Sequence, residues 1–269
     1  MQESIPVPAP FDAIASTYDD AFSNSSIGRV QRSLVWLEAD RVFGAGQHVL
    51  EINCGTGIDA LHLASRGIKV LACDSAPRMV EVARRRLNAS ASPGDVDVRC
   101  VAIEHLSTLE AEAAYDGIFS NFAGLNCVRD LNSVVADMAR LVKPGGKVVL
   151  CLFGRTCIWE ILLYTFRGDF RRAFRRFRRQ GIAVLAPGSK IDVHYPSVGS
   201  LRRIFSLYFR LEGWRGVGIT VPPSYLEALA VSFPRLLTFA TAIDAHFGKC
   251  PGLRAFADHV VLTFERSAA

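Results

Sequence analysis

The sequence has no apolar run that approaches the roughly 18 residues needed to span a bilayer. Its N-terminus also lacks a basic region followed by an apolar stretch, so we predict no secretory signal and expect a cytoplasmic protein. The seven cysteines include no Cys-x-x-Cys pair and form no metal-like cluster with histidine. We therefore expect reduced, mostly buried thiols and predict no metal site.

The chain has little net positive charge outside one segment. Seven arginines and one aspartate lie between Arg167 and Arg179, and this excess is larger than the net charge of +5 carried by all 269 residues. The remainder of the chain is therefore close to neutral. That distribution argues against a broad nucleic-acid-binding surface, and we expect no nucleic-acid partner.

Apolar runs alternate with helical patterns through the first part of the chain. Strand-like runs occur at 47–53, 68–73, 96–101, 115–121 and 147–153, and later ones at 209–220 and 259–265. Helical patterns occupy 57–66, 77–88, 104–112 and 128–142. Near-continuous apolar strands separated by helices are typical of a parallel sheet covered on both faces. We predict an α/β fold with a Rossmann-like, doubly wound, mostly parallel seven-stranded sheet and helical lid elaborations.

The pattern changes after the fifth predicted strand. We expect 155–180 to be helical, 181–189 to be a connection that bears glycine and proline, and 191–195 to be a short strand. This region reads as an elaboration of the sheet and not as an independent domain. The predicted parts of the single domain are an N-terminal helical cap (1–45), a ligand-binding core (46–154), and lid insertions with the last two sheet strands (155–269).

The turn after the first predicted strand is the most informative segment. It runs Glu-Ile-Asn-Cys-Gly-Thr-Gly from Glu51 to Gly57. Glycine permits a positive φ and has no Cβ to block the approach of backbone to a ligand. Asp74 closes the second predicted strand, where an acidic side chain can accept hydrogen bonds from ribose hydroxyls. The turn has neither the third glycine of a dinucleotide site nor the Gly-Lys-Ser/Thr of a phosphate loop, and by itself it also fits an ordinary strand–helix turn.

Five segments, in this order, resemble the class I S-adenosylmethionine (SAM)-dependent methyltransferases. They are FDAIASTYDD, VLEINCGTG, VLACDSAPRMVEVARRRL, YDGIFSNFAGLN and LVKPGGKVVL. The resemblance covers roughly residues 11–154 and extends more loosely to the last strands. Five segments in the family's order and spacing are more specific than any one glycine turn. The resemblance implies SAM as the methyl donor and S-adenosylhomocysteine as the product.

The resemblance also implies roles for individual residues. Glu51 would contact the methionine end of SAM, Asp74 would hold the ribose, and Phe122 would lie beside the reactive methyl. The implied SAM-binding set is Tyr18, Glu51, Asn53, Cys54, Gly55, Gly57, Asp74, Ser75, Met79, Ile103, Glu104, Asn121 and Phe122. Other readings stay open for three of these residues: Cys54 as a structural thiol, Tyr18 as a helix-face aromatic, and Met79 as core filling.

One position departs from the family's pattern. The position after the third strand, usually acidic, aligns here with Ala102 or Ile103, so the adenine contact would rest on backbone or on Glu104.

The sequence says less about the molecule that accepts the methyl group than about the methyl donor. No Asn/Asp-Pro-Pro-aromatic string, the mark of methylation at planar nitrogens, follows the fourth strand, and Ser120 to Asn126 resembles the small-molecule methyltransferases instead. His194, with Tyr195, lies in the part expected to cover the substrate. We therefore name His194 and Tyr195 as candidate catalytic residues, with a structural or surface histidine as the alternative.

A basic and aromatic segment is the second informative feature. Phe166, Phe170, Phe174 and Phe177 recur at helical spacing among the arginines of 166–179. Such a helix can bind an anionic membrane surface or an acidic carrier. The alternative is a lid helix with its phenylalanines in the core and its arginines in water.

We therefore predict a SAM-dependent methyltransferase that acts on a small, hydrophobic or lipid-like acceptor, with O-methylation as the first choice. The cytoplasmic protein would contact membranes, if at all, at their surface. The alternatives are an RNA or protein methyltransferase and a SAM-binding protein without catalysis. The sequence predicts no oligomeric state.

Overall fold

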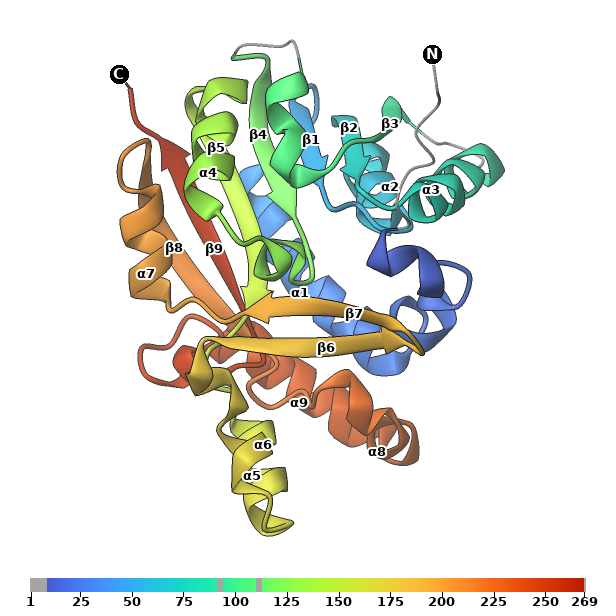
Figure 1. The fold of residues 1–269 in the computed structure, drawn as a ribbon, viewed down its shortest axis with the longest axis vertical. Coiled ribbons are helices and arrows are strands. Elements are labelled where there is room, and N and C mark those ends of the chain that lie inside the picture. Colours follow the sequence, from blue (N-terminus) through green and yellow to red (C-terminus); the bar gives the residue numbers. More distant parts are fainter. Residues whose placement is uncertain (1–8, 91–93, 110–112, 269) are drawn as a thin grey trace.

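The computed structural model describes residues 9–90, 94–109 and 113–268 (Figure 1). Two predicted features extend beyond these ranges. Residues 1–8 of the N-terminal cap and residues 110–112, at the end of the helix predicted over 104–112, lie outside the described residues.

A seven-stranded sheet forms the centre of the molecule, in the order β3-β2-β1-β4-β5-β9-β8. Strands β1 to β5 and β8 run in the same direction. Strand β9 runs antiparallel to both of its neighbours, β5 and β8. The strands are β1 (His48–Ile52), β2 (Lys69–Asp74), β3 (Val96–Cys100), β4 (Tyr115–Ser120), β5 (Val142–Phe153), β8 (Phe209–Val217) and β9 (His259–Arg266). The predicted doubly wound, mostly parallel sheet is confirmed.

Helices cover both faces of the sheet, and each face has its own hydrophobic core. One face packs against α1 (Ser26–Val42), α2 (Ile58–Ser65), α3 (Pro77–Ala89), α8 (Glu227–Ser232) and α9 (Pro234–Phe247). The other packs against α4 (Leu131–Leu141), α7 (Val198–Phe205) and the short helix η3 (Ile103–Thr108). Alternate residues of each strand face the two cores, as the period of two in a strand requires.

The carboxyl ends of β1, β2, β4 and β5 meet at one edge of the sheet, and two elaborations cover that edge (Figure 1). One is the N-terminal segment with the short helices η1 (Pro10–Ile14) and η2 (Asp19–Ser23). The other is a hairpin of β6 (Gln180–Ala186) and β7 (Ser189–His194) that crosses below the sheet. Ser189 Oγ donates a hydrogen bond to the Pro10 carbonyl at 2.8 Å, so the two covers are joined.

The prediction that 181–189 is a connection without regular structure was wrong. Residues Gln180 to Ala186 form a strand that pairs with β7 in antiparallel register. Pro187 and Gly188, with Gly188 at a φ of +81°, make the tight turn of the hairpin. Ile182 and Val184 lie on the exposed face of this strand, whereas Ala183 and Leu185 line a cavity on its other face.

The prediction of continuous helix over 155–180 was also wrong. Gly168, at a φ of +71°, interrupts the segment, which folds as α5 (Ile158–Phe166), α6 (Phe170–Ala173) and the single turn η5 (Arg175–Arg178). The phenylalanines do not enter the core: Phe166 is 93% exposed and Phe170 is 61% exposed. The alternative of buried phenylalanines with solvated arginines is therefore wrong for these side chains. Within the described residues, no helix is long and apolar enough to cross a bilayer.

Candidate functional site

The turn after β1 has the backbone geometry that its glycines predict. Asn53, Gly55 and Gly57 have φ values of +58°, +54° and +77°. A Cβ added to Gly55 would meet no atom within 4 Å, whereas one added to Gly57 would lie 2.9 Å from the Cβ of Ala83. Gly57 is therefore required by packing between α2 and α3. Gly55 leaves bare backbone facing open space.

Asp74 joins the end of β2 to this turn. Its Oδ2 accepts a hydrogen bond from the Gly55 N–H at 2.8 Å, and its Oδ1 accepts one from the Ala76 N–H at 2.9 Å. Burial raises the pKa of Asp74, and the hydrogen bonds from Ala76 and Gly55 oppose that shift. The carboxylate thus fixes the turn and keeps lone pairs for a ligand.

These residues line a hollow of about 240 Å³ at the carboxyl edge of the sheet. Ten of the residues expected to hold SAM line it: Tyr18, Asn53, Gly55, Asp74, Ser75, Met79, Ile103, Glu104, Asn121 and Phe122. Glu51, Cys54 and Gly57 are not among its lining residues, and Glu51 and Cys54 are buried behind the turn. The structure therefore gathers most of the predicted set around one hollow.

Two buried polar atoms at the turn have no hydrogen-bond partner within the described chain. They are Glu51 Oε2 and Asn53 Nδ2. Burial raises the pKa of Glu51 well above its usual range, and the nearby Asp59 adds to the shift. Of the two, only Asn53 lines the hollow, where its Nδ2 can donate a hydrogen bond to the carboxylate of a bound amino acid beside the bare backbone of Gly55. The hollow therefore fits the carboxylate of the methionine end of SAM.

A buried polar network fixes Asn121, and the sequence interpretation did not identify it. Asp59 on α2 accepts hydrogen bonds from Trp36 Nε1 at 2.6 Å and from Asn121 Nδ2 at 3.2 Å, and it pairs with Arg32 of α1. The Asn121 Oδ1 accepts the Phe122 N–H at 2.8 Å. Asn121 is thereby held at the end of β4. A charged residue on the buried face of α2 was the available signal for Asp59.

The N-terminal segment is attached to the turn by charged groups. Asp19 accepts a hydrogen bond from Thr56 Oγ1 at 2.7 Å and also pairs with Arg86 of α3. The attachment places Tyr18 over the hollow, and burial raises its pKa to about 12, so its phenol is neutral. The segment therefore forms one wall of the site.

A larger cavity of about 370 Å³ adjoins this hollow. Five residues line both spaces: Phe11, Tyr18, Phe122, Cys127 and Ile191. The lining of the larger cavity is mainly apolar and aromatic and comes from the N-terminal segment, the hairpin and the residues after β8. A polar ligand in the first hollow and an apolar ligand in this cavity would thus meet at the Phe122 ring.

His259, at the start of β9, lies in the wall of the larger cavity and was not identified from the sequence. Its ring stacks on Phe153 with centroids 4.8 Å apart and lies edge-on to Phe122 at 5.5 Å. Burial lowers the pKa of His259, although the neighbouring Asp258 opposes the shift. The imidazole is therefore neutral at pH 7 and can accept a proton.

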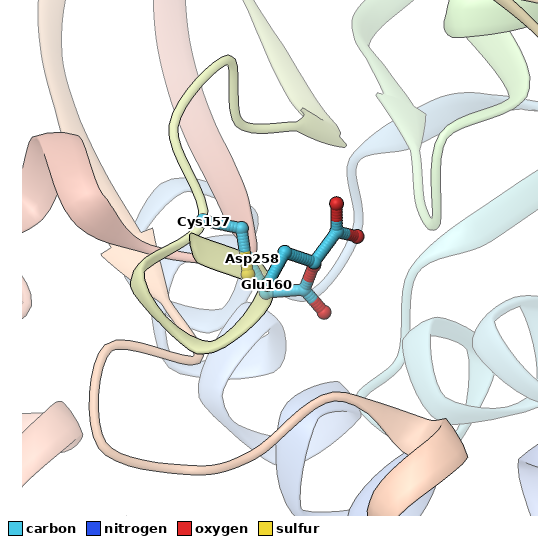
Figure 2. A group of neighbouring side chains, drawn as sticks. All are labelled: Cys157, Glu160 and Asp258. Atoms are coloured by element: carbon cyan, nitrogen blue, oxygen red, sulfur yellow. The ribbon is translucent and has the colours of Figure 1, made fainter. Parts of the chain in front are cut away.

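The side chains of Cys157, Glu160 and Asp258 point toward one another, with potential metal-ligand atoms within 4.8 Å of each other (Figure 2). Both carboxylates, however, accept hydrogen bonds from Arg176, at 2.7 Å from Glu160 and 2.6 Å from Asp258. Burial would raise the pKa of Glu160, but Arg175 and Arg176 outweigh it and hold that pKa below its usual value. We interpret the cluster as an ion-pair network that closes one end of the cavity.

His194 and Tyr195 lie elsewhere. Both line a separate hollow of about 220 Å³ beside the hairpin. Side chains alternate along a strand, so His194 faces away from the side on which Ile191 and Val193 line the apolar cavity. The catalytic role of His194 and Tyr195 stays a prediction.

Comparison with known proteins adds to this geometry. Residues 49–146 match a family described as a methyltransferase domain. The chain is 30% identical over 183 residues to the demethylmenaquinone methyltransferase of Renibacterium salmoninarum, covering 67% of this chain and 68% of that protein. It is 37% identical over 112 residues to the ubiquinone biosynthesis O-methyltransferase of Xanthomonas oryzae pv. oryzae, covering 42% and 45%.

These similarities extend over only part of most relatives. The chain spans 58% and 61% of the length of two further demethylmenaquinone methyltransferases. Among solved structures, a SAM-dependent methyltransferase of Methanosarcina mazei superimposes with a TM-score of 0.60 at 17% identity, over 86% of this chain and 98% of that one. At that identity the likeness concerns the fold alone.

Proposed function

The chain belongs to the class I SAM-dependent methyltransferases, and we propose that it transfers a methyl group from SAM to a small, hydrophobic, quinone-type acceptor. The observation that carries the proposal is the pair of adjoining spaces, one with several polar lining groups and one mainly apolar, with five lining residues in common. Donor and acceptor would meet there without water between them.

The polar hollow is the proposed SAM site. Asp74 would accept hydrogen bonds from the ribose hydroxyls, and Asn53 with the backbone of Gly55 would hold the methionine end. Met79 and Glu104 line the same hollow and would flank the adenine. When bound, SAM supplies an electrophilic methyl group on a sulfonium whose departure leaves a neutral thioether.

The chain's own contribution would be alignment, exclusion of water and removal of one proton. Alignment of nucleophile and methyl can supply much of the acceleration in such a transfer. For a phenolic acceptor we propose His259 as the base, because its imidazole is neutral and lies in the cavity wall. Its Nδ1 lies 3.4 Å from Asp258 Oδ2 without a hydrogen bond, and a ring nitrogen that carries no proton would accept the one from the hydroxyl group.

The quinone-type acceptor is supported by two independent observations. The cavity is lined mainly by apolar and aromatic side chains, which suit a ring with a hydrophobic tail. The names of the two curated relatives refer to demethylmenaquinone and to ubiquinone biosynthesis. O-methylation remains our first choice because a hydroquinone hydroxyl needs the base that His259 would provide.

The test is a transfer assay with labelled SAM and reduced demethylmenaquinone, and with unsubstituted hydroquinones of increasing chain length. We expect label in the organic phase, with kcat/KM rising with chain length. RNA and total protein serve as competing acceptors. Label in those fractions alone would overturn the proposal, as would SAM binding without turnover on any hydroquinone.

We further propose that the segment 166–179 contacts an anionic membrane surface, from which such an acceptor would enter. Phe166, Phe170, Phe174 and Phe177 are all exposed, and they lie among exposed arginines. The helices α5 and α6 project from the body of the protein (Figure 1). Apolar side chains beside arginines complement lipid tails and anionic headgroups. An acidic carrier protein is the alternative partner.

Vesicle sedimentation tests this contact. We expect binding to vesicles that contain phosphatidylglycerol and its loss in the double variant Phe166→Ser and Phe170→Ser. Leu207→Ser, at an apolar side chain that is 75% exposed between α7 and β8, is the matched control. Absence of binding at low salt, or equal losses in both variants, would contradict the proposal.

A further inference from the structure

The hollow that contains His194 has an unusual distribution of charge. Its lining includes Arg129, Arg155 and Arg179, which come from three separate segments of the chain. No aspartate or glutamate lines it among the described residues. The hollow shares only Val128 with the described lining of the polar hollow that we assign to SAM. It is therefore a distinct site on the molecule.

The three arginines lack partners within the described ranges. None of the three side chains makes an ion pair or a hydrogen bond there. The Nε of Arg155 is buried and unpaired, and its guanidinium lies 6.0 Å from the ring of Phe177. Neighbouring Arg175 and Arg176 are different, because both are neutralised by Glu160. This hollow therefore differs from the neighbouring ion-pair network, where Glu160 supplies the carboxylate.

Three like charges around one hollow repel one another, and a half-buried guanidinium without a partner loses solvation that nothing replaces. An anion placed among them would remove both costs. Arginine presents its N–H groups in a planar fork that matches the oxygens of phosphate, and such charge-assisted bonds are about twice as strong as neutral ones. The residues therefore favour a ligand with several anionic oxygens.

Neutral polar groups complete the lining. Asn132, Tyr195, Ser197 and Ser200 bring amide and hydroxyl groups to the same hollow, and His194 adds a ring nitrogen. Ser197 Oγ accepts a hydrogen bond from the Ser200 N–H at 3.1 Å and donates its own proton to Ser200 Oγ at 3.1 Å, so the Ser200 hydroxyl keeps its proton for a ligand. Hydroxyl and amide donors beside arginines are the usual surroundings of a bound phosphoryl group.

We infer that this hollow binds a phosphate mono- or diester, held by Arg129, Arg155 and Arg179. The phosphate belongs either to a soluble phosphorylated molecule or to a phospholipid headgroup, since both present the same oxygens. The inference does not depend on methyl transfer, because the hollow is distinct from both cavities of the proposed reaction.

The test measures thermal unfolding of the full chain in inorganic phosphate and in glycerol 1-phosphate, against chloride at equal ionic strength. We expect a rise in Tm with both phosphates and a dissociation constant that Arg155→Gln weakens at least about tenfold. Arg129→Gln, at an exposed side chain, gives the same result without risk to folding. Arg202→Gln is the control, because it removes one charge from α7 outside the lining.

A second arm distinguishes the two sources of phosphate. If glycerol 1-phosphate has no effect, and Arg129→Gln and Arg155→Gln weaken binding to vesicles of phosphatidylglycerol while Arg202→Gln does not, the site takes a headgroup in addition to the contact proposed for 166–179. The inference would be overturned if Tm were the same in phosphate as in chloride and all three variants weakened vesicle binding equally. SAM binding, measured in parallel, should be unchanged in all three variants.

Discussion

Replacement of Asp74 by asparagine tests the proposed cofactor site most directly. The substitution keeps the shape of the side chain and removes its charge. Asp74 uses one oxygen for the Gly55 N–H at 2.8 Å and the other for the Ala76 N–H at 2.9 Å. Asparagine offers only one acceptor oxygen, so its NH2 group must face one of these two N–H donors.

The expected effects on stability and on binding differ in size. A hydrogen bond to a charged group contributes roughly 1.5–3 kcal/mol, and the variant loses at least one within the turn and weakens those proposed to the ribose. We therefore expect SAM affinity to fall by at least about 2 kcal/mol, a factor of about 30. Burial raises the pKa of Asp74, which means that the charged carboxylate carries a desolvation cost in the folded protein. The neutral asparagine avoids that cost, so we expect the free energy of unfolding to change by only about 1 kcal/mol.

Isothermal titration with SAM and with S-adenosylhomocysteine measures the affinity, and thermal unfolding measures the stability. Asp97→Asn is the control, since Asp97 is an exposed carboxylate on β3 that pairs with Arg99 at the surface. The assignment of Asp74 to the ribose would be refuted by a folded Asp74→Asn protein that binds SAM within about threefold of the wild type.

Three further substitutions, with Gly188→Ala as the comparison for one of them, test other parts of the structure. His259→Gln should lower kcat/KM by about 100-fold or more for a hydroxyl acceptor. Because burial lowers the pKa of His259, wild-type activity should persist below the usual imidazole pKa and fall only at more acidic pH. The His259→Gln variant should lack that acidic fall in activity. If its pH profile equals that of the wild type, His259 is not the base. Gly57→Ala should lower the free energy of unfolding by about 2 kcal/mol or more, since φ at Gly57 is +77° and the new Cβ would lie 2.9 Å from the Cβ of Ala83. Gly188→Ala, at a φ of +81° with no atom within 4 Å of the new Cβ, should lower it by about 1 kcal/mol. Thermal unfolding measures both losses. Arg176→Gln should destabilise by about 3 kcal/mol or more, because it removes the arginine that pairs with the buried Asp258 and leaves Glu160 with Arg175 alone. Urea unfolding would measure the loss, and a variant of unchanged stability would show that Asp258 finds another partner.

Local sequence spacing was sufficient for the nucleotide-type turn. Glu51 to Gly57 and Asp74 lie at the ends of adjacent parallel strands, so the strand pattern alone places them at one edge. The same reasoning brought Asn121 there through β4. It did not reveal Asp59 or Arg32, because their contact joins α1 to α2 and depends on how two helices pack against the sheet.

The hairpin and the basic segment show where periodicity misleads. The phenylalanines from Phe166 to Phe177 have helical spacing, but Gly168 adopts a positive φ and ends the helix between them. Pro187 and Gly188 lie between two apolar stretches, and this pattern is typical of a hairpin turn. We instead took the glycines and proline of 181–189 as the mark of a connection.

His259 could not be assigned by any local pattern. It reaches the cavity because β9 runs antiparallel to β5, which places His259 opposite Phe153 in the register. A histidine at the start of a strand has many structural roles, and only this long-range pairing gives it neighbours from the cavity wall. Predicting its position would have required the strand order of the sheet.

The position of β9 has a consequence for biosynthesis. β9 lies between β5 and β8, and both of these strands precede it in the chain. While the ribosome is still making residues 218–258, the edge of β5 is exposed and β8 has no partner in the sheet. Exposed strand edges of this kind pair readily with other chains. Nascent chains that stall before β9 are thus the state most exposed to aggregation, and they also lack His259 and one wall of the cavity.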